Sequence, residues 1–330
     1  EARDRGALAA GDDEGVDLRE LARQAQGDPE IAATLAGSYA RLADLQGPTR
    51  GVSVGKPREA EANARKALEW FARVPERAAL DAAVATWHAN AHSMLAGLAQ
   101  QRGELPHALA HFEDSIALLR RALRQRPHDR ALQRALAPKL GMVGQLHQTV
   151  GMPSMQQGDE ALRWIDEAAA IYDRLIAQEN HRGDRLHRAL LESGQAVVHQ
   201  RYDRLAESLA CLERAEAVLA ALVRESESLD SGVVHAHATV LNNLSFVQGR
   251  LGRHEQALAS AALALRRTEQ LREHDPDNRA WRQRWAIFGQ GYAGSLIETA
   301  RHAEALALLR RIEPVWHEDR ASATSTPEQR

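Results

Sequence analysis

Cysteine and aromatic residues are scarce in this 330-residue chain, which has one cysteine and only 4% Phe, Trp and Tyr. A single cysteine excludes an internal disulfide and the multi-cysteine frameworks of structural zinc sites. Cys211 falls between core positions of a predicted helix. We therefore interpret it as a buried inert thiol, with a redox sensor as the alternative. The sequence also lacks a secretory signal and any long apolar run that would predict a membrane span.

Lysine is also scarce: Lys56, Lys66 and Lys139 are its only instances, and arginine supplies the remaining positive charge. The 42 basic and 45 acidic side chains give a net charge of −3. Because nucleic-acid-binding proteins carry a basic excess or stripe, we expect no nucleic-acid partner. β-Branched residues never form an alternating run, so no strand is predicted, and the Ala- and Leu-rich apolar content favours closely packed helices.

Catalytic and cofactor motifs are absent from the sequence. The segment Gly51–Pro57 superficially resembles a phosphate-binding loop, but its glycines are one residue too close and Pro57 replaces the Mg²⁺-binding hydroxyl. The glycine-rich loop and the His-Arg-Asp and Asp-Phe-Gly signatures of protein kinases are missing. We therefore expect no enzyme activity and no cofactor, and we predict an irregular inter-helix loop at Gln46–Pro57.

Two histidine pairs have helical spacing, His88/His92 and His107/His111. Residues four apart share one helix face, where two imidazoles can bind a metal ion together. No carboxylate or cysteine completes either pair at motif spacing. We therefore interpret these side chains as surface or groove histidines and predict no metal site.

A short helical pattern recurs six times at intervals of about 48 residues. Each copy opens with a small residue, is apolar four residues later, and has a third core residue, usually small, seven residues later. Offsets of four and seven lie on one helix face. The opening positions are Glu59-Ala60, Ala108-Leu109, Ala161-Leu162, Ser208-Leu209, Ala257-Leu258 and Ala305-Leu306. This pattern is typical of the second helix of a tetratricopeptide repeat.

The predicted first helices carry the matching Leu-Gly position of that repeat, as Leu95-Ala96, Leu140-Gly141, Leu244-Ser245 and Tyr292-Ala293. Gly103 and Gly252 take the inter-helix turn, where glycine tolerates a positive φ. The standard repeat has 34 residues, so a repeat of about 48 needs helices of about 18–20 residues. We predict an all-α, tetratricopeptide-like right-handed superhelix of about six helical hairpins, with another helical array as the alternative.

The predicted domain organisation has three parts. Residues 1–15 form an N-terminal linker, residues 16–320 the repeat domain, and residues 321–330 a disordered tail that is rich in Ser, Thr and Pro. The first residue is Glu1 rather than Met, and we expect the chain to be a fragment of a longer protein.

One stretch carries a more specific resemblance. Leu35–Pro48 reads Leu-Ala-Gly-Ser-Tyr-Ala-Arg-Leu-Ala-Asp-Leu-Gln-Gly-Pro, and it is preceded by Gly27-Asp28-Pro29 and followed by a short glycine-containing loop and an Ala-rich helix. Over residues 16–74 this resembles the first repeat of bacterial transmembrane serine/threonine protein kinases with a C-terminal tetratricopeptide region. This sequence has Ala43 where that family has Gly, and Pro48 directly follows Gly47 without the intervening Asn.

The resemblance implies a periplasmic sensor domain, preceded in the parent protein by a kinase domain and one membrane helix. A cytoplasmic adaptor, or the effector-binding domain of a transcription regulator, is the alternative. In either case we expect a protein or peptide ligand in the groove that stacked repeats form. Any membrane attachment would come from an anchor outside this fragment.

Alignment to the repeat predicts polar side chains that face this groove. The candidates are Asn90, Gln100, Lys139, Gln145, Asn242, Asn243 and Arg250. Trp281 and Trp285, four residues apart, are interpreted as packing residues, with an aromatic platform in the groove as the alternative.

Overall fold

Alternating long helices and short connections make up the computed structural model, which describes residues 28–47, 56–149 and 151–324. No strand occurs among these described residues, as predicted. The predicted linker at residues 1–15 and most of the predicted loop at Gln46–Pro57 lie outside them.

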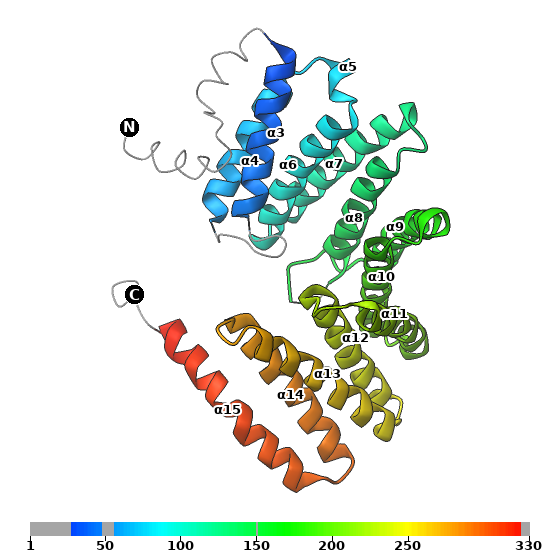
Figure 1. The fold of residues 1–330 in the computed structure, drawn as a ribbon, viewed down its shortest axis with the longest axis vertical. Coiled ribbons are helices and arrows are strands. Elements are labelled where there is room, and N and C mark those ends of the chain that lie inside the picture. Colours follow the sequence, from blue (N-terminus) through cyan, green and yellow to red (C-terminus); the bar gives the residue numbers. More distant parts are fainter. Residues whose placement is uncertain (1–27, 48–55, 150, 325–330) are drawn as a thin grey trace. The chain divides into compact units, whose positions relative to one another are not determined.

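Thirteen helices are present in this part of the chain (Figure 1). They are α3 (Pro29–Gln46), α4 (Pro57–Phe71), α5 (Glu76–Ala79), α6 (Ala82–Gln101), α7 (Leu105–Gln125), α8 (Arg130–His147), α9 (Gly158–Glu179), α10 (Arg182–Arg201), α11 (Leu205–Glu225), α12 (Ser231–Arg250), α13 (His254–His274), α14 (Arg279–Glu298) and α15 (His302–Thr324). None of these helices is both long enough and apolar enough to cross a membrane.

Twelve of the helices pair as six hairpins, which are α3–α4, α6–α7, α8–α9, α10–α11, α12–α13 and α14–α15. The six-hairpin prediction is therefore confirmed over the described residues. The short helix α5 follows the first hairpin and was not predicted. The backbone of α15 continues to Thr324, so the helix extends four residues past the predicted domain end at residue 320. Residues 325–330 lie outside the described part.

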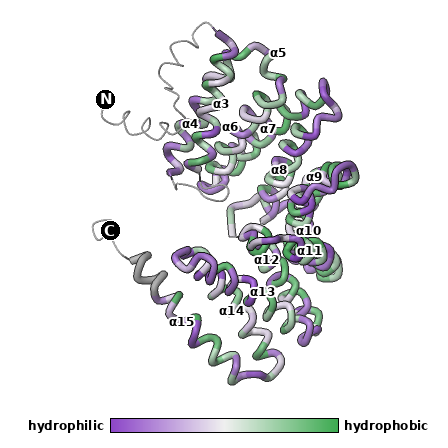
Figure 2. The backbone as a smooth tube through the Cα atoms, viewed as in Figure 1, coloured by the Kyte–Doolittle hydropathy of each residue, from purple (hydrophilic) through white to green (hydrophobic). Residues whose placement is uncertain are grey.

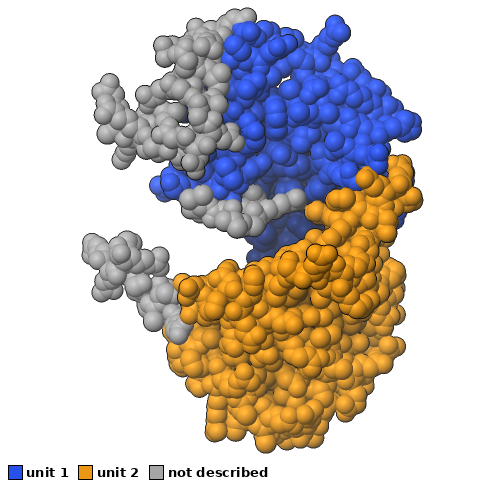
Figure 3. Space-filling view, viewed as in Figure 1, with its two compact units in different colours: residues 1–175 blue, residues 176–330 orange. Residues whose placement is uncertain are grey.

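The chain divides into two compact units, Glu1–Leu175 and Ile176–Arg330 (Figure 3). The division falls inside α9. Unit 1 contains the first two hairpins together with α8 and most of α9, and unit 2 contains the hairpins from α10 to α15. Hydrophobic and hydrophilic stretches alternate along the helices of both units (Figure 2).

The small residues of the repeat pattern lie where the helices of a hairpin touch. All six opening residues are buried, with exposed fractions of 0–2%: Ala60, Ala108, Ala161, Ser208, Ala257 and Ala305. The residues seven positions later are buried as well: Ala67, Ser115, Ala168, Ala215, Ala264 and Ile312. A small side chain lets two helix axes approach closely. The burial of both sets of residues therefore confirms the predicted register of the second helices.

The first helices begin at side-chain caps. Asp or Asn precedes five of them and accepts hydrogen bonds from backbone N–H groups two or three residues later: Asp28, Asp81, Asp129, Asp230 and Asn278. The imidazole of His181 does the same for α10. Each cap satisfies N–H groups that have no partner within the helix, which typically stabilises a helix by about 1 kcal/mol.

The turn inside a hairpin is a repeated left-handed cap. Gly103, Asp203, Gly252 and Ala300 have φ values of 78°, 58°, 73° and 59°. At each turn the N–H of the next residue donates to the carbonyl five positions earlier, as from Glu104 to Ala99 and from Arg253 to Gln248. This is the Schellman arrangement. It explains the predicted glycines and shows that Asp203 and Ala300 adopt the same strained conformation.

The predicted packing roles of Cys211 and Trp285 are confirmed, because both are buried, with 5% and 3% of their surface exposed. Burial raises the pKa of Cys211 to about 11, so the thiol stays protonated and unreactive at neutral pH. Trp285 packs in the core of unit 2 with Leu265 and Ile312, which excludes a groove platform formed by Trp281 and Trp285.

The left-handed turns lead to a paired prediction. Gly252→Ala should destabilise the protein by about 1 kcal/mol, because an L-residue at positive φ is strained. Ala300→Gly should stabilise it by a similar amount for the same reason. A Cβ at Gly252 meets no atom within 4 Å, so contacts do not contribute to the effect. Urea denaturation of the two variants measures it, and shifts in the same direction would contradict the conformational explanation.

Candidate functional site

In unit 1, a row of polar side chains connects the first helices of three successive hairpins. Lys139 on α8 donates from Nζ to Oδ1 of Asn90 on α6, at 2.8 Å. The amide of Asn90 donates in turn to Oδ2 of Asp44 on α3, at 3.5 Å. The structure thus brings together two predicted groove residues, Asn90 and Lys139, and adds Asp44, which the sequence analysis missed.

The burial of Lys139 determines whether this row of side chains can bind a partner. Lys139 is only 9% exposed and Asn90 is half-buried. A buried ammonium group is tolerated only when it has polar partners, and Lys139 has them within the protein. The row therefore ties neighbouring hairpins together, and Lys139 is not an exposed charge ready to bind a partner.

Two further predicted groove residues, Gln100 and Gln145, differ in exposure. Gln100 is 5% exposed, and its Nε2 donates to the carbonyl oxygen of Pro153 at 3.0 Å. It anchors the connection between α8 and α9, which covers the end of α6, so its side chain is engaged within the protein. Its role in the groove stays a prediction. Gln145 on α8 is exposed.

In unit 2, a cavity of about 300 Å³ opens between α12, α14 and the start of α13. Two predicted groove residues, Asn242 and Arg250, line it. The other lining residues are Ser245, Phe246, Gly249, His254, Ala257, Gly291, Gly294, Ser295 and Glu298. Asn243 is half-buried on α12 but is not part of this lining.

The walls of the unit 2 cavity combine apolar and polar surface. Phe246 is 54% exposed, an unusual state for a large apolar side chain. On α14, a Cβ at Gly294 would meet no atom within 4 Å, and a Cβ at Gly291 would lie 3.0 Å from Oδ1 of Asn242. The two glycines therefore leave room beside Phe246 that larger residues would fill.

Ion pairs surround the unit 2 cavity. Arg250 donates to Asp203 at 2.9 Å, and Nδ1 of His254 lies 2.8 Å from a carboxylate oxygen of Glu298. The side chains of Arg250, His254 and Glu298 are about half exposed, and that of Asp203 is 75% exposed. Exposed pairs contribute little to stability, so they can exchange partners at small cost. The rim thus offers both signs of charge to a ligand.

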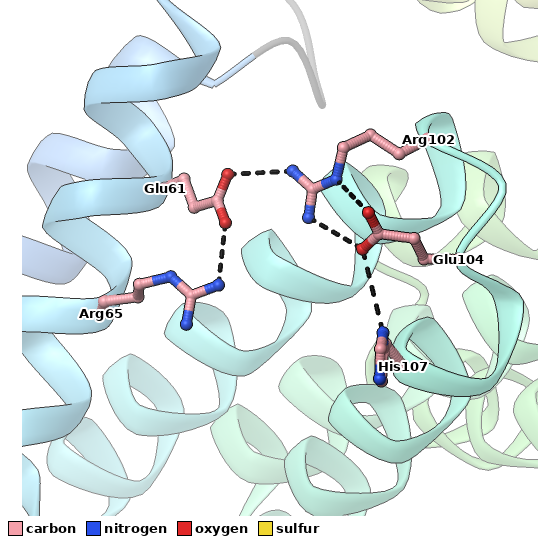
Figure 4. A network of polar contacts seen from close by, with 5 residues as sticks. All are labelled: Glu61, Arg65, Arg102, Glu104 and His107. Carbon is pink, nitrogen blue, oxygen red and sulfur yellow. Dashed lines mark hydrogen bonds and ion pairs between the residues drawn. The ribbon is translucent and has the colours of Figure 1, made fainter.

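A second polar network lies in unit 1, where α4, α6 and α7 meet (Figure 4). Arg102 donates to Glu61 at 2.9 Å and to both carboxylate oxygens of Glu104, at 2.9 and 3.1 Å. Arg65 also donates to Glu61, at 2.9 Å, and this hydrogen bond is the main cause of the lowered pKa of Glu61. His107 lies 3.9 Å from Glu104.

This network borders a smaller cavity of about 280 Å³, which is also lined by Leu95, Ala99, Ala110 and His111. Its acidic and basic groups neutralise one another, so it offers no net charge to a ligand. The Glu61–Arg65 and Glu104–His107 pairs have the i,i+4 and i,i+3 spacings that a sequence pattern can reveal, and Arg102 lies two residues from Glu104. Only the contact of Arg102 with Glu61, 41 residues away, depends on packing between distant helices.

Comparison with solved structures was consistent with the predicted fold class. The crystal structure of BtubC (BKLC) from P. vanneervenii superposes with a TM-score of 0.57 at 17% sequence identity, covering 82% of this chain and 94% of that chain. A putative kinesin light chain with nearly identical TPR-like repeats from Podosopora anserina gives a TM-score of 0.47 at 17% identity, covering 73% and 99%. No family model and no curated protein sequence matches the chain. The chain has the all-α, tetratricopeptide-like fold.

The contrast between Lys139 and Arg250 gives a prediction. Lys139→Met should destabilise the protein by about 1–3 kcal/mol, because it leaves the partly buried side-chain carbonyl of Asn90 without its donor. Arg250→Ala, which removes an exposed ion pair, should change stability by less than about 1 kcal/mol. Thermal denaturation of the two variants compares these effects. Equal losses would show that the polar row does not tie the hairpins together.

Proposed function

We propose that this chain is a non-catalytic binding module whose unit 2 cavity holds a segment of a protein or peptide partner. The observation that carries the proposal is one cavity that combines exposed Phe246, the amide of Asn242 and the open wall at Gly294. Binding sites typically join an apolar surface to a few polar groups that orient the ligand. A volume of about 300 Å³ suits one or two side chains of a peptide.

The chemistry of the lining defines the partner. An apolar side chain of the partner packs against Phe246, and its backbone pairs with Asn242, which can both donate and accept hydrogen bonds. Charged residues of either sign on both sides of this anchor meet the rim at Arg250 and Glu298. The partner is therefore a segment with an apolar anchor and polar flanks.

We also propose that this binding module is the periplasmic sensor domain of a bacterial receptor-type serine/threonine kinase. The resemblance over residues 16–74 supports this assignment. Partner binding would alter kinase output only through a difference in affinity between two arrangements of the parent protein. A cytoplasmic adaptor, or the effector-binding domain of a transcription regulator, would use the same cavity without a membrane-anchored kinase.

Peptide binding tests the first proposal. A peptide selected on the wild-type chain from a displayed random library should bind at least about tenfold more weakly to Phe246→Ala, because aromatic anchors dominate such contacts. Gly294→Leu should also weaken binding by filling the cavity, and replacing a helical glycine should not lower stability. Fluorescence anisotropy with the labelled peptide measures both effects.

Leu190→Ala is the matched control for Phe246→Ala, because Leu190 is an exposed apolar residue on a first helix of unit 2 outside the cavity lining. It should leave peptide affinity unchanged. Selected peptides that bind Phe246→Ala and Gly294→Leu as well as the wild type would place binding elsewhere on the chain.

Membrane topology tests the sensor assignment. In the full-length parent protein, a reporter enzyme that is active only outside the cytoplasmic membrane, fused after Arg330, should be active. A cytoplasmic reporter at the same position should be silent. The reverse pattern would exclude the periplasmic sensor and support the adaptor, while leaving the peptide-binding proposal intact.

A further inference from the structure

His92, His111 and Asp114 come together between the two helices of the second hairpin. His92 lies on α6, and His111 and Asp114 lie three residues apart on α7. The Nδ1 atoms of His92 and His111 are 3.2 Å apart, and Nδ1 of His92 is 3.6 Å from Oδ2 of Asp114. One ligand atom from each residue lies within 4.8 Å of the other two.

We propose that these three side chains form a binding site for a divalent transition-metal ion of the Zn²⁺ type. Tetrahedral Zn²⁺ with bonds of about 2.0–2.1 Å separates its ligand atoms by about 3.3 Å. The two distances from His92, 3.2 and 3.6 Å, lie on either side of this value. Two imidazoles and one carboxylate are a ligand set that zinc uses in proteins, with the fourth position left open. The proposal is independent of the unit 2 cavity.

The protonation state of the site favours the metal. Burial lowers the pKa of His92 to about 4, although nearby Asp114 opposes the shift, and burial also lowers the pKa of His111. Both imidazoles are therefore neutral at neutral pH, as a metal ligand must be. His88, Arg65 and His107 are the other titratable groups that act on these two rings.

Access to the site is uneven. The side chain of His92 is 14% exposed, whereas that of Asp114 is 62% exposed. His111 also lines the 280 Å³ cavity of unit 1, which gives an ion a route to the rings. The metal would join α6 to α7 and keep one coordination position towards solvent. That position would accept water or a side chain of a partner.

A neighbouring ring supports the position of His92. The His88 ring lies 5.3 Å from the His92 ring and stacks on Phe71 at 4.4 Å with an interplanar angle of 13°. This stack restricts the orientation of the His88 imidazole, against which His92 lies. His88 does not belong to the set of three ligand atoms, and in the proposal it holds His92 in place without binding the ion.

Cobalt binding by the metal-stripped chain tests the proposal. Titration with Co²⁺ should saturate at one equivalent with the visible absorption of a low-coordinate site, and Zn²⁺ should displace it. Asp114→Asn should weaken binding at least about tenfold, and His111→Ala should abolish the signal. Since His111 is only partly buried and Asp114 is exposed, both variants should fold, which circular dichroism checks.

The matched control is His107→Ala. His107 lies on the same helix, one turn before His111, and its side chain is 79% exposed. This variant should bind Co²⁺ like the wild type.

Two outcomes would overturn the proposal. Either no saturable Co²⁺ binding occurs, or binding is unchanged in both His111→Ala and Asp114→Asn. In both cases the two imidazoles share only a hydrogen bond between Nδ1 atoms, with Asp114 as a nearby charge.

Discussion

Close contact between the two helices of each hairpin is the constraint on which the rest of this structure depends. Side chains no larger than alanine or serine allow that contact at Ala60, Ala108, Ala161 and Ala257, which are 0–2% exposed. Where serine replaces alanine, the hydroxyl still pairs across the contact. Ser208 donates to the carbonyl oxygen of Ala196 at 3.0 Å, and Ser115 donates to that of Ala89 at 2.8 Å. The hydroxyls therefore carry no cost of burying an unpaired polar group.

The tight hairpin contact also determines where functional groups can lie. It brings α6 so close to α7 that two imidazoles from different helices lie 3.2 Å apart. Small residues act differently on α14, where Gly291 and Gly294 do not seal a hairpin but leave space beside Phe246. The same reduction in side-chain size produces a closed core in one place and an open cavity in another. The difference is whether a neighbouring helix fills the space.

The polar residues illustrate the limits of reasoning from sequence. The repeat alignment selected Asn242 and Arg250, which line the unit 2 cavity. It also selected Lys139 and Gln100, which are buried and paired within the protein. Their exposure depends on Asn90 and on the connection at Pro153. These partners are 49 and 53 residues away in the sequence. No local pattern encodes contacts over that distance.

The sequence by itself determined the long helices and the buried face of the second helices, because both follow from local chemistry. Helix propensity, caps such as Asp81 and Asp129, turn glycines such as Gly252, and a small residue repeated on one face are all properties of short segments. The tertiary structure alone decided that His92 lies beside His111 and Asp114. The two histidines lie on different helices, and only the packing of α6 on α7 brings them together.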